Sequence, residues 1–353
     1  NGACVCHLDL DHDDVLEFIQ TPRHQLPWIK RCVDLTTDMW DKTPYKKELL
    51  EGIKAGDIWL NKIKHDRYGN RIYSNVCLEV YLPSRGTCLL QHVSLGACTI
   101  SDISKGFSEG MSDLCNLHSR TGIGESGEYL TPENDRQVGL GMLGLANLLR
   151  RYKVTYEEFG EALDQVIHGN SAHGNAGKIA EEIQTGVYRA AEIARLHHMV
   201  RAFAIAPTAS CSYNTKDLDG YTSCPEIAPP IARSVDRDSG TFGVTSYDYG
   251  DVEIASEVGW TAYKKVADGI MTLLGKTGLL HGYSFNSWSD VVTYDNAFVE
   301  EWLGSPQTSL YYSLQVMGDV QDKSSAYAAL DESEVDSYLD GILNNEPTCD
   351  CQE

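Results

Sequence analysis

Three side chains able to do acid–base and redox chemistry occupy alternate positions of one short segment. Asn75, Cys77 and Glu79 offer an amide, a thiol and a carboxylate within residues 71–82, a stretch rich in β-branched and aromatic residues. In an extended segment, residues two apart share a face, so we expect these side chains to project together while the apolar residues between them pack inward. A thiol beside a hydrogen-bonding amide and a proton-accepting carboxylate is a candidate catalytic set. The alternative is a strand whose polar face meets solvent.

A second thiol, Cys88, follows 11 positions after Cys77 on the mainly apolar stretch 87–100. If the two stretches are neighbours in the fold, Cys88 reaches the same site. The alternative is a core cysteine, which is the more common role of any one cysteine.

A run of small and polar residues follows the strand predicted at residues 200–206. Its members are Thr208, Ala209, Ser210, Cys211 and Ser212. Small residues let backbone N–H groups approach a ligand, and the hydroxyl groups add donors. If a helix begins here, its first turn favours a phosphate. The alternative is an ordinary helix cap.

Two further pairs of residues lie near the end of the chain. Tyr311 and Tyr312 fall within the apolar strand predicted at residues 309–316. Adjacent strand residues point to opposite faces, so the pattern alone indicates two half-buried aromatics rather than one shared pocket. Cys349 and Cys351 lie in a polar tail, where two close thiols could act as a mobile reductant or bind a metal.

The fold that must position these residues alternates strands with helices. Strands are predicted at residues 4–10, 71–82, 200–206 and 309–316. Helices are predicted at residues 12–20, 44–55, 132–152, 156–167, 176–197, 252–274 and 333–343. This alternation favours an α/β architecture. Because no repeat or linker interrupts the chain, one domain over residues 1–344 with a flexible cysteine-containing tail over 345–353 is the simplest organisation.

Composition excludes several classes of function. The 353 residues carry 29 basic and 51 acidic side chains, a net charge of −22, which would repel nucleic acids and anionic membranes. No run approaches the ~20 apolar residues of a membrane span, and no secretory signal opens the chain. The 11 cysteines are odd in number and irregularly spaced, which indicates a reducing cytoplasm. The first residue is Asn1, so we expect a processed, split or truncated chain.

In their order along the chain, these motifs resemble those of the large catalytic subunit of class I ribonucleotide reductase. Residues 1–18 resemble the family's Gly-Ala strand and acidic helix, and residues 75–79 match its N-x-C-x-E finger loop. Residues 136–149 resemble its glycine-rich strand-to-helix segment, and residues 206–212 its phosphate-binding turn. Tyr311-Tyr312, with the cysteine tail, matches the radical-relay tyrosines and the reducing tail. The resemblance covers nearly the whole chain.

The resemblance implies a ten-stranded α/β barrel of two half-barrels, with the finger loop through its centre and N-terminal strands missing. It makes Cys77 the thiyl radical that removes the ribose 3′ hydrogen, and Glu79 the acceptor of the 3′-hydroxyl proton. Asn75 would hold the ribose hydroxyls. Cys88 would be one of two thiols that deliver reducing equivalents as the 2′-hydroxyl leaves as water.

It also implies roles outside the finger loop. Residues 208–212 would hold the substrate phosphates, and Cys349 and Cys351 would re-reduce the active-site disulfide. Residues 22–32 would form the loop that reports the bound effector, with Arg31 as a candidate contact. The family's second redox cysteine would precede Asn1, because neither Cys4 nor Cys6 stands in its position.

The implied partners follow from the class I arrangement. A small, metal-containing β subunit would supply the radical through Tyr311 and Tyr312, with no cofactor or metal bound directly by this chain. Thioredoxin or glutaredoxin would restore the thiols, nucleotides would act as substrate and effector, and the chain would form a homodimer, with or without an upstream fragment. The location would be the cytoplasm, or the host cytoplasm for a viral enzyme.

Three alternatives stay open from the sequence. The first is a cobalamin-dependent reductase, which would bind adenosylcobalamin and need no radical-generating subunit. The second is a catalytically inactive barrel that only binds nucleotides or a partner. The third is a redox protein that binds a metal through the tail cysteines.

Overall fold

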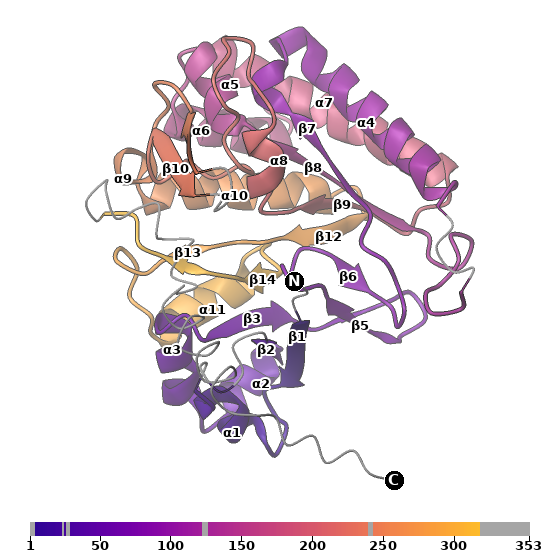
Figure 1. Cartoon of the computed structure of the whole chain (residues 1–353), viewed down its shortest axis with the longest axis vertical. Helices are drawn as coiled ribbons and strands as arrows, with labels where there is room; N and C mark the ends of the chain where they lie inside the picture. The colour runs from indigo at the N-terminus through magenta and orange to yellow at the C-terminus, as the bar shows by residue number, and fades with distance from the viewer. Residues whose placement is uncertain (1–3, 23–24, 26–28, 122–125, 239–242, 318–353) are drawn as a thin grey trace.

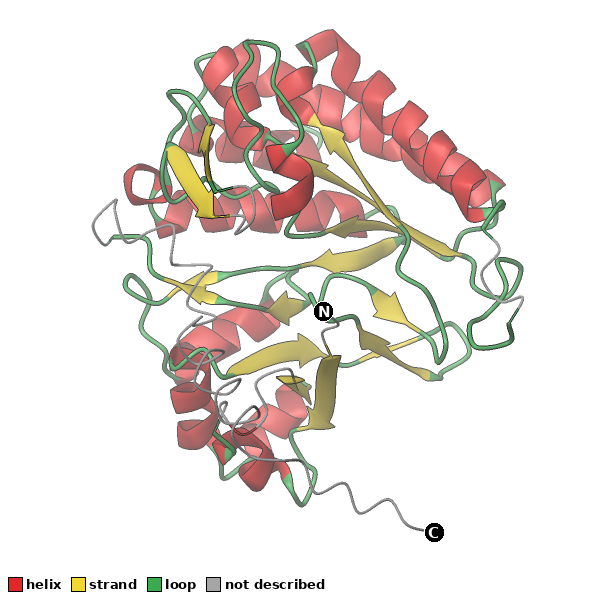
Figure 2. Cartoon of the chain, in the orientation of Figure 1, coloured by secondary structure: helices red, strands yellow, loops and turns green. Residues whose placement is uncertain are grey.

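The computed structural model of the chain describes residues 4–22, 25, 29–121, 126–238 and 243–317. Two four-stranded sheets organise these residues, and helices cover the outer side of each sheet (Figures 1 and 2). Short strands and loops run between the two layers.

The first sheet has the strand order β1-β2-β3-β14. Its strands are β1 (Cys4–Asp9), β2 (Ile29–Leu35), β3 (Ile58–Lys62) and β14 (Ser309–Leu310). β1, β2 and β3 are parallel, and β14 joins β3 in the antiparallel sense. The helices of this layer are α1 (Val15–Gln20), α2 (Thr37–Lys42) and α3 (Lys46–Lys54), so the helices predicted at residues 12–20 and 44–55 are confirmed in shorter form.

The second sheet has the order β12-β9-β8-β7, and all of its pairings are parallel. Its strands are β7 (Leu90–Ser94), β8 (Gln137–Leu143), β9 (Arg201–Ile205) and β12 (Leu280–Tyr283). The long helices of this layer are α4 (Ile103–His118), α5 (Leu145–Arg151), α6 (Tyr156–Ile167), α7 (Gly174–Leu196) and α10 (Trp260–Gly275). The helices α4 and α7 lie side by side over the sheet (Figure 1).

The remaining elements are short. The strands are β4 (Lys64–His65), β5 (Arg71–Ser74), β6 (Tyr81–Leu82), β10 (Ser234–Asp238), β11 (Val244–Asp248), β13 (Ser287–Trp288) and β15 (Ser313–Leu314). The helices are η2 (Leu95–Ala97), η3 (Ile100–Asp102), α8 (Ala209–Tyr213), α9 (Ala255–Val258) and α11 (Asn296–Gly304). β4, β5 and β6 form an antiparallel sheet, and β10 pairs with β11 as a hairpin.

The α/β class with parallel sheets is confirmed, whereas a closed ten-stranded barrel is not found among the described residues. The two sheets have separate edges. The strand β14 belongs to the first sheet, whereas β13 and β15 pair with each other in a separate two-stranded sheet. The described residues therefore form two sheets that face a shared middle layer, with no ladder of described strands that joins them.

The long helix predicted over residues 132–152 is wrong in its first half, which forms β8. A Cβ atom on Gly141 would lie 2.3 Å from the Ala204 carbonyl oxygen and 2.5 Å from His92 Nε2. Because glycine has no side chain at position 141, β9 and the His92 ring can approach β8 this closely. Gly144 turns the chain into α5 with φ +73°. The leucine spacing suits a fully buried strand as well as a helix.

Three other segments divide where one element was expected. The helix predicted at 252–274 breaks at Gly259, whose φ of +78° separates α9 from α10. The strand at 309–316 is split into β14 and β15, and the extended stretch 71–82 is the hairpin of β5 and β6. The helix predicted at 333–343 and the tail at 345–353 lie outside the described residues.

A hydrophobic core runs through both layers, and a smaller cluster joins them. The smaller cluster contains Cys32, Trp59, Leu78 and Tyr311, all buried. It brings β2 and β3 of the first sheet against the hairpin loop and the chain segment near residue 311. The candidate catalytic residues lie beside this second cluster.

Candidate functional site

The loop of the β5–β6 hairpin carries the predicted catalytic residues. The Asn75 N–H donates to the Val80 carbonyl at 2.9 Å, and the Asn75 side-chain oxygen accepts from the Val80 N–H at 3.1 Å. Leu78 adopts φ +66° and is fully buried, which anchors the loop tip. The residues therefore converge through a tight loop, not through the shared strand face that alternation predicted.

Ser284 ties this loop to the second sheet. Its Oγ donates to the Cys77 carbonyl oxygen at 2.6 Å and lies 3.1 Å from Glu79 Oε2. Ser284 follows β12, and its N–H donates to the Ile205 carbonyl at the end of β9. The loop is thus held at the carboxyl edge of two parallel strands, the edge where α/β sheets bind ligands.

The protonation of Cys77 and Glu79 follows from their burial. Burial raises the pKa of the Cys77 thiol and the Glu79 carboxylate raises it further, against smaller opposing effects of Tyr311 and Lys30. Burial also raises the pKa of Glu79, and hydrogen bonds from Asn75 and Ser284 oppose that rise. The sulfur therefore keeps its proton, as a hydrogen-atom donor requires and a nucleophilic thiolate does not.

Cys88 belongs to the same group of residues. Asn75 Nδ2 lies 3.4 Å from Cys88 Sγ, so the amide bridges the two segments. The surrounding protein atoms, followed by the Glu79 carboxylate, raise the pKa of the Cys88 thiol, although the side chain keeps an exposed face. The structure thus brings Cys88 to the Asn75 loop, as expected if the two stretches were neighbours.

Tyr311 and Tyr312 share one environment, although strand alternation predicted that they would point to opposite faces. They lie in the break between β14 and β15, with ring centroids 4.1 Å apart. Lys30 Nζ donates to both hydroxyl groups at 2.9 Å. Burial and the neighbouring Cys77 raise the pKa of Tyr311. Lys30 was not singled out from the sequence, because 281 positions separate it from Tyr311.

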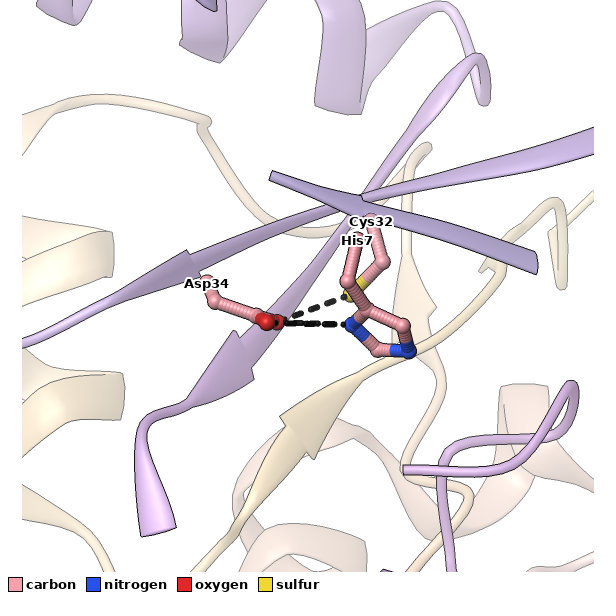
Figure 3. Close-up of side chains that lie close together, drawn as sticks. All are labelled: His7, Cys32 and Asp34. Carbon is pink, nitrogen blue, oxygen red and sulfur yellow. Dashed lines mark hydrogen bonds and ion pairs between the residues drawn. The ribbon is translucent and has the colours of Figure 1, made fainter. Parts of the chain in front are cut away.

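A polar network behind the loop was also missed. His7 Nδ1 lies 2.9 Å from Asp34, and the Cys32 thiol lies 3.7 Å from Asp34 (Figure 3). The Asp34 carboxylate also accepts from Arg71 at 2.8 Å. His7 Nε2 lies 2.9 Å from the carbonyl oxygen of Ser74, the residue before Asn75. The donor types suit a metal, but these hydrogen bonds already engage both ring nitrogens and the carboxylate. The network anchors the start of the loop.

The predicted phosphate turn follows β9. Ala206 N–H donates to His92 Nε2 at 3.1 Å, and burial lowers the pKa of His92 to about 4, so its ring is a neutral acceptor. Thr208 adopts φ +53°, and its Oγ accepts from the Glu226 N–H at 2.8 Å. The buried Ser212 hydroxyl donates to Ala209 O, whereas Ser210 and Cys211 are exposed. Phosphate binding here stays a prediction.

A buried acid lies beside this turn. Burial raises the pKa of Glu226 to about 8, and a hydrogen bond from Tyr283 opposes the rise. The Tyr283 hydroxyl contacts the Tyr263 hydroxyl at 2.8 Å, which extends the polar row into the helical layer. The position of Glu226 after the irregular segment 214–225 gave no sequence signal.

Arg31 contacts the end of α1. It is buried in β2, and its guanidinium donates to the Phe18 carbonyl and, at 3.2 Å, to the Ile19 carbonyl near the end of α1. A cation there suits the helix C-terminus. Its effector contact stays a prediction, and Cys349 and Cys351 lie outside the described residues.

Comparisons with known proteins bear on the fold alone. No protein-family model matches the chain, and no curated protein matches it. Among solved structures, the alpha subunit of a class Id ribonucleotide reductase from Actinobacillus ureae superposes with a TM-score of 0.52 and 15% sequence identity. The match covers 91% of this chain and 71% of that one. The chain therefore has a fold similar to that of this reductase subunit.

Within the described part of the chain, no helix combines the length and the apolar character needed to cross a bilayer.

Proposed function

We propose that this chain reduces ribonucleotides to 2′-deoxyribonucleotides through a thiyl radical at Cys77. The observation that carries the proposal is the convergence of Asn75, Cys77 and Glu79 of one loop with Cys88 of the following segment, and with Tyr311 and Tyr312 beside Cys77. The overall similarity to a solved reductase alpha subunit supports it.

The reaction begins with hydrogen-atom removal. The Cys77 radical takes the 3′ hydrogen, which breaks a C–H bond and forms the S–H bond. Glu79 accepts the 3′-hydroxyl proton, and the 2′-hydroxyl leaves as water after protonation. Two thiols supply the two electrons and become a disulfide, and Cys88 is one of them. Cys77 then returns the hydrogen atom to C3′. The second thiol is not assigned among the cysteines of this chain.

The other assignments are part of the same proposal. A metal-containing small subunit supplies the radical through Tyr312 and Tyr311. The segment 208–212 holds substrate phosphates, and Cys349 and Cys351 pass electrons from thioredoxin or glutaredoxin. Nucleotide effectors act at the loop near Arg31. The half-buried position of Cys77 shields its radical from bulk water.

A reduction assay tests the proposal. The chain is incubated with radiolabelled ribonucleoside diphosphates and triphosphates, candidate small subunits, an upstream reductase polypeptide and dithiothreitol, and deoxynucleotides are separated chromatographically. We expect product from the unmodified chain and none from Cys77→Ser, with Cys98→Ser as the control because its thiol donates to Ser94 O elsewhere. Equal product from the Cys77 variant would reject the assignment of the radical thiol. Product with adenosylcobalamin and no small subunit would favour the cobalamin-dependent alternative.

A further inference from the structure

Lys30 is a half-buried cation with an unusual set of partners. It projects from β2 and donates to the hydroxyl groups of Tyr311 and Tyr312, each at 2.9 Å. Its ammonium also lies 4.9 Å from the Trp59 ring centroid and 5.1 Å from those of both tyrosines. Among the described residues, no carboxylate lies within 4 Å of it. The ammonium is therefore stabilised by two phenol oxygens and by aromatic rings, with no ion pair among the described residues.

The direction of the hydrogen bonds between Lys30 and the two tyrosines follows from which side chains can donate. An ammonium has only donors, so both phenol oxygens must accept from Lys30. The O–H of each tyrosine is then free to point elsewhere. The rings of Tyr311 and Tyr312 lie with their centroids 4.1 Å apart, and Tyr311 belongs to the buried cluster against which Cys77 packs. Tyr312, Tyr311 and Cys77 therefore form a row, with Lys30 beside its first two members.

We propose that Lys30 is a positioning residue of the radical relay, which orients both phenol O–H bonds along the row and couples proton to electron movement. This inference rests on the proposed function. In the step it governs, a Tyr311 phenoxyl radical takes the hydrogen atom of Cys77. The S–H bond breaks and the O–H bond forms, so the sulfur is oxidised, the phenoxyl is reduced, and no net charge moves. The initial oxidant is the radical-generating partner.

The charge of Lys30 explains the coupling. If an electron left a tyrosine before its proton did, a cationic phenol would form against the ammonium, and the repulsion would oppose that path. If the proton left first, the ammonium would stabilise the phenolate, and the stabilised phenolate would lose its electron less readily. Joint transfer of proton and electron creates neither charge. Lys30 therefore favours joint transfer along the row.

The first test measures the contact without any enzymatic activity. 3-Fluorotyrosine is placed at position 312, and its ¹⁹F chemical shift is measured at neutral pH in the unmodified, Lys30→Met, Lys30→Arg and Lys47→Met chains. Removing the ammonium, which lies 2.9 Å from the Tyr312 hydroxyl, should move the ¹⁹F resonance, whereas Lys30→Arg should follow the unmodified chain. Lys47 is an exposed lysine of α3 and serves as the control. A Lys30→Met value within measurement error of the unmodified chain would overturn the inference.

The second test uses ribonucleotide reduction. We expect Lys30→Met to lower kcat at least tenfold with KM unchanged, and Lys30→Arg to restore part of the loss, which a general packing defect would not show. If Lys30→Met turned over like the unmodified chain, the relay role would be wrong. If the unmodified chain reduced no ribonucleotide in any combination, the proposed function would fail, while the ¹⁹F chemical shift of the fluorotyrosine would still decide the contact. Should Lys30→Met not fold, Lys30→Gln, which keeps a donor without charge, replaces it in both tests.

Discussion

The buried carboxyl group of Glu226 makes the stability of this protein depend on pH in a defined direction. Its pKa is about 8 in the folded chain against 4.5 for an unperturbed carboxyl, with burial as the cause. Between these values the folded state keeps a proton that the unfolded state has lost. The folded state therefore binds more protons, and the free energy of unfolding must fall as pH rises through this window.

The magnitude follows from linkage. Each pH unit inside the window removes up to ~1.4 kcal/mol, so the loss between about pH 5 and about pH 8 is roughly 4 kcal/mol, as an order of magnitude. Glu226→Gln has nearly the same shape and does not titrate. The free energy of unfolding of the variant minus that of the unmodified chain should therefore rise with pH across the window, whatever constant difference the substitution adds.

Urea unfolding followed by circular dichroism measures this difference at several pH values. Because both proteins share all other titrating groups, the subtraction isolates Glu226. Glu192→Gln, on the exposed side of α7, reports what removing a surface carboxylate does. A Glu226→Gln difference that stays flat across the window would refute the reasoning, because it would mean that the carboxyl is ionised or solvated in the folded protein.

The remaining predictions concern the sheet, the polar network and the thiols. Gly141→Ala should lower the free energy of unfolding by roughly 3 kcal/mol, because the new Cβ meets the Ala204 carbonyl at 2.3 Å, and a fall of less than about 1 kcal/mol in urea titrations would contradict that packing. Asp34→Asn leaves Arg71 and His7 without their shared carboxylate and should cost about 3–5 kcal/mol, checked by thermal unfolding, with the exposed Asp38→Asn as control. Cys88→Ser should leave the Cys77 radical able to form but should abolish deoxynucleotide product, and full turnover of this variant would remove Cys88 from the electron path.

Local patterns anticipated the elements whose stability is local. The helix at residues 156–167 matches α6 at both ends, because an apolar stripe of helical period follows a capping box of Thr155 and Glu158. The strand at residues 200–206 matches β9 closely, since its residues after Arg201 are apolar and buried. The helix predicted over residues 132–152 was wrong in its first half because a fully buried strand and a buried helix present the same apolar run.

The candidate site shows a different limit of prediction from sequence. Asn75, Cys77 and Glu79 were singled out by their chemistry, and the structure places them on one loop, which is not a strand. Lys30 and Ser284 were missed because their partners lie 281 and 207 positions away, and no local pattern records such contacts. The tyrosine pair was misjudged by alternation for the same reason, since a break between β14 and β15 gives both side chains one environment.

The electrostatics of the loop disfavour nucleophilic thiolate chemistry. A nucleophilic cysteine needs a base or cation that removes its proton. Burial and the neighbouring Glu79 carboxylate instead raise the pKa of the Cys77 thiol, and Lys30, which opposes that rise, directs its donors to two phenols. A thiol that keeps its proton fits the proposed step, in which the hydrogen leaves the sulfur as an atom.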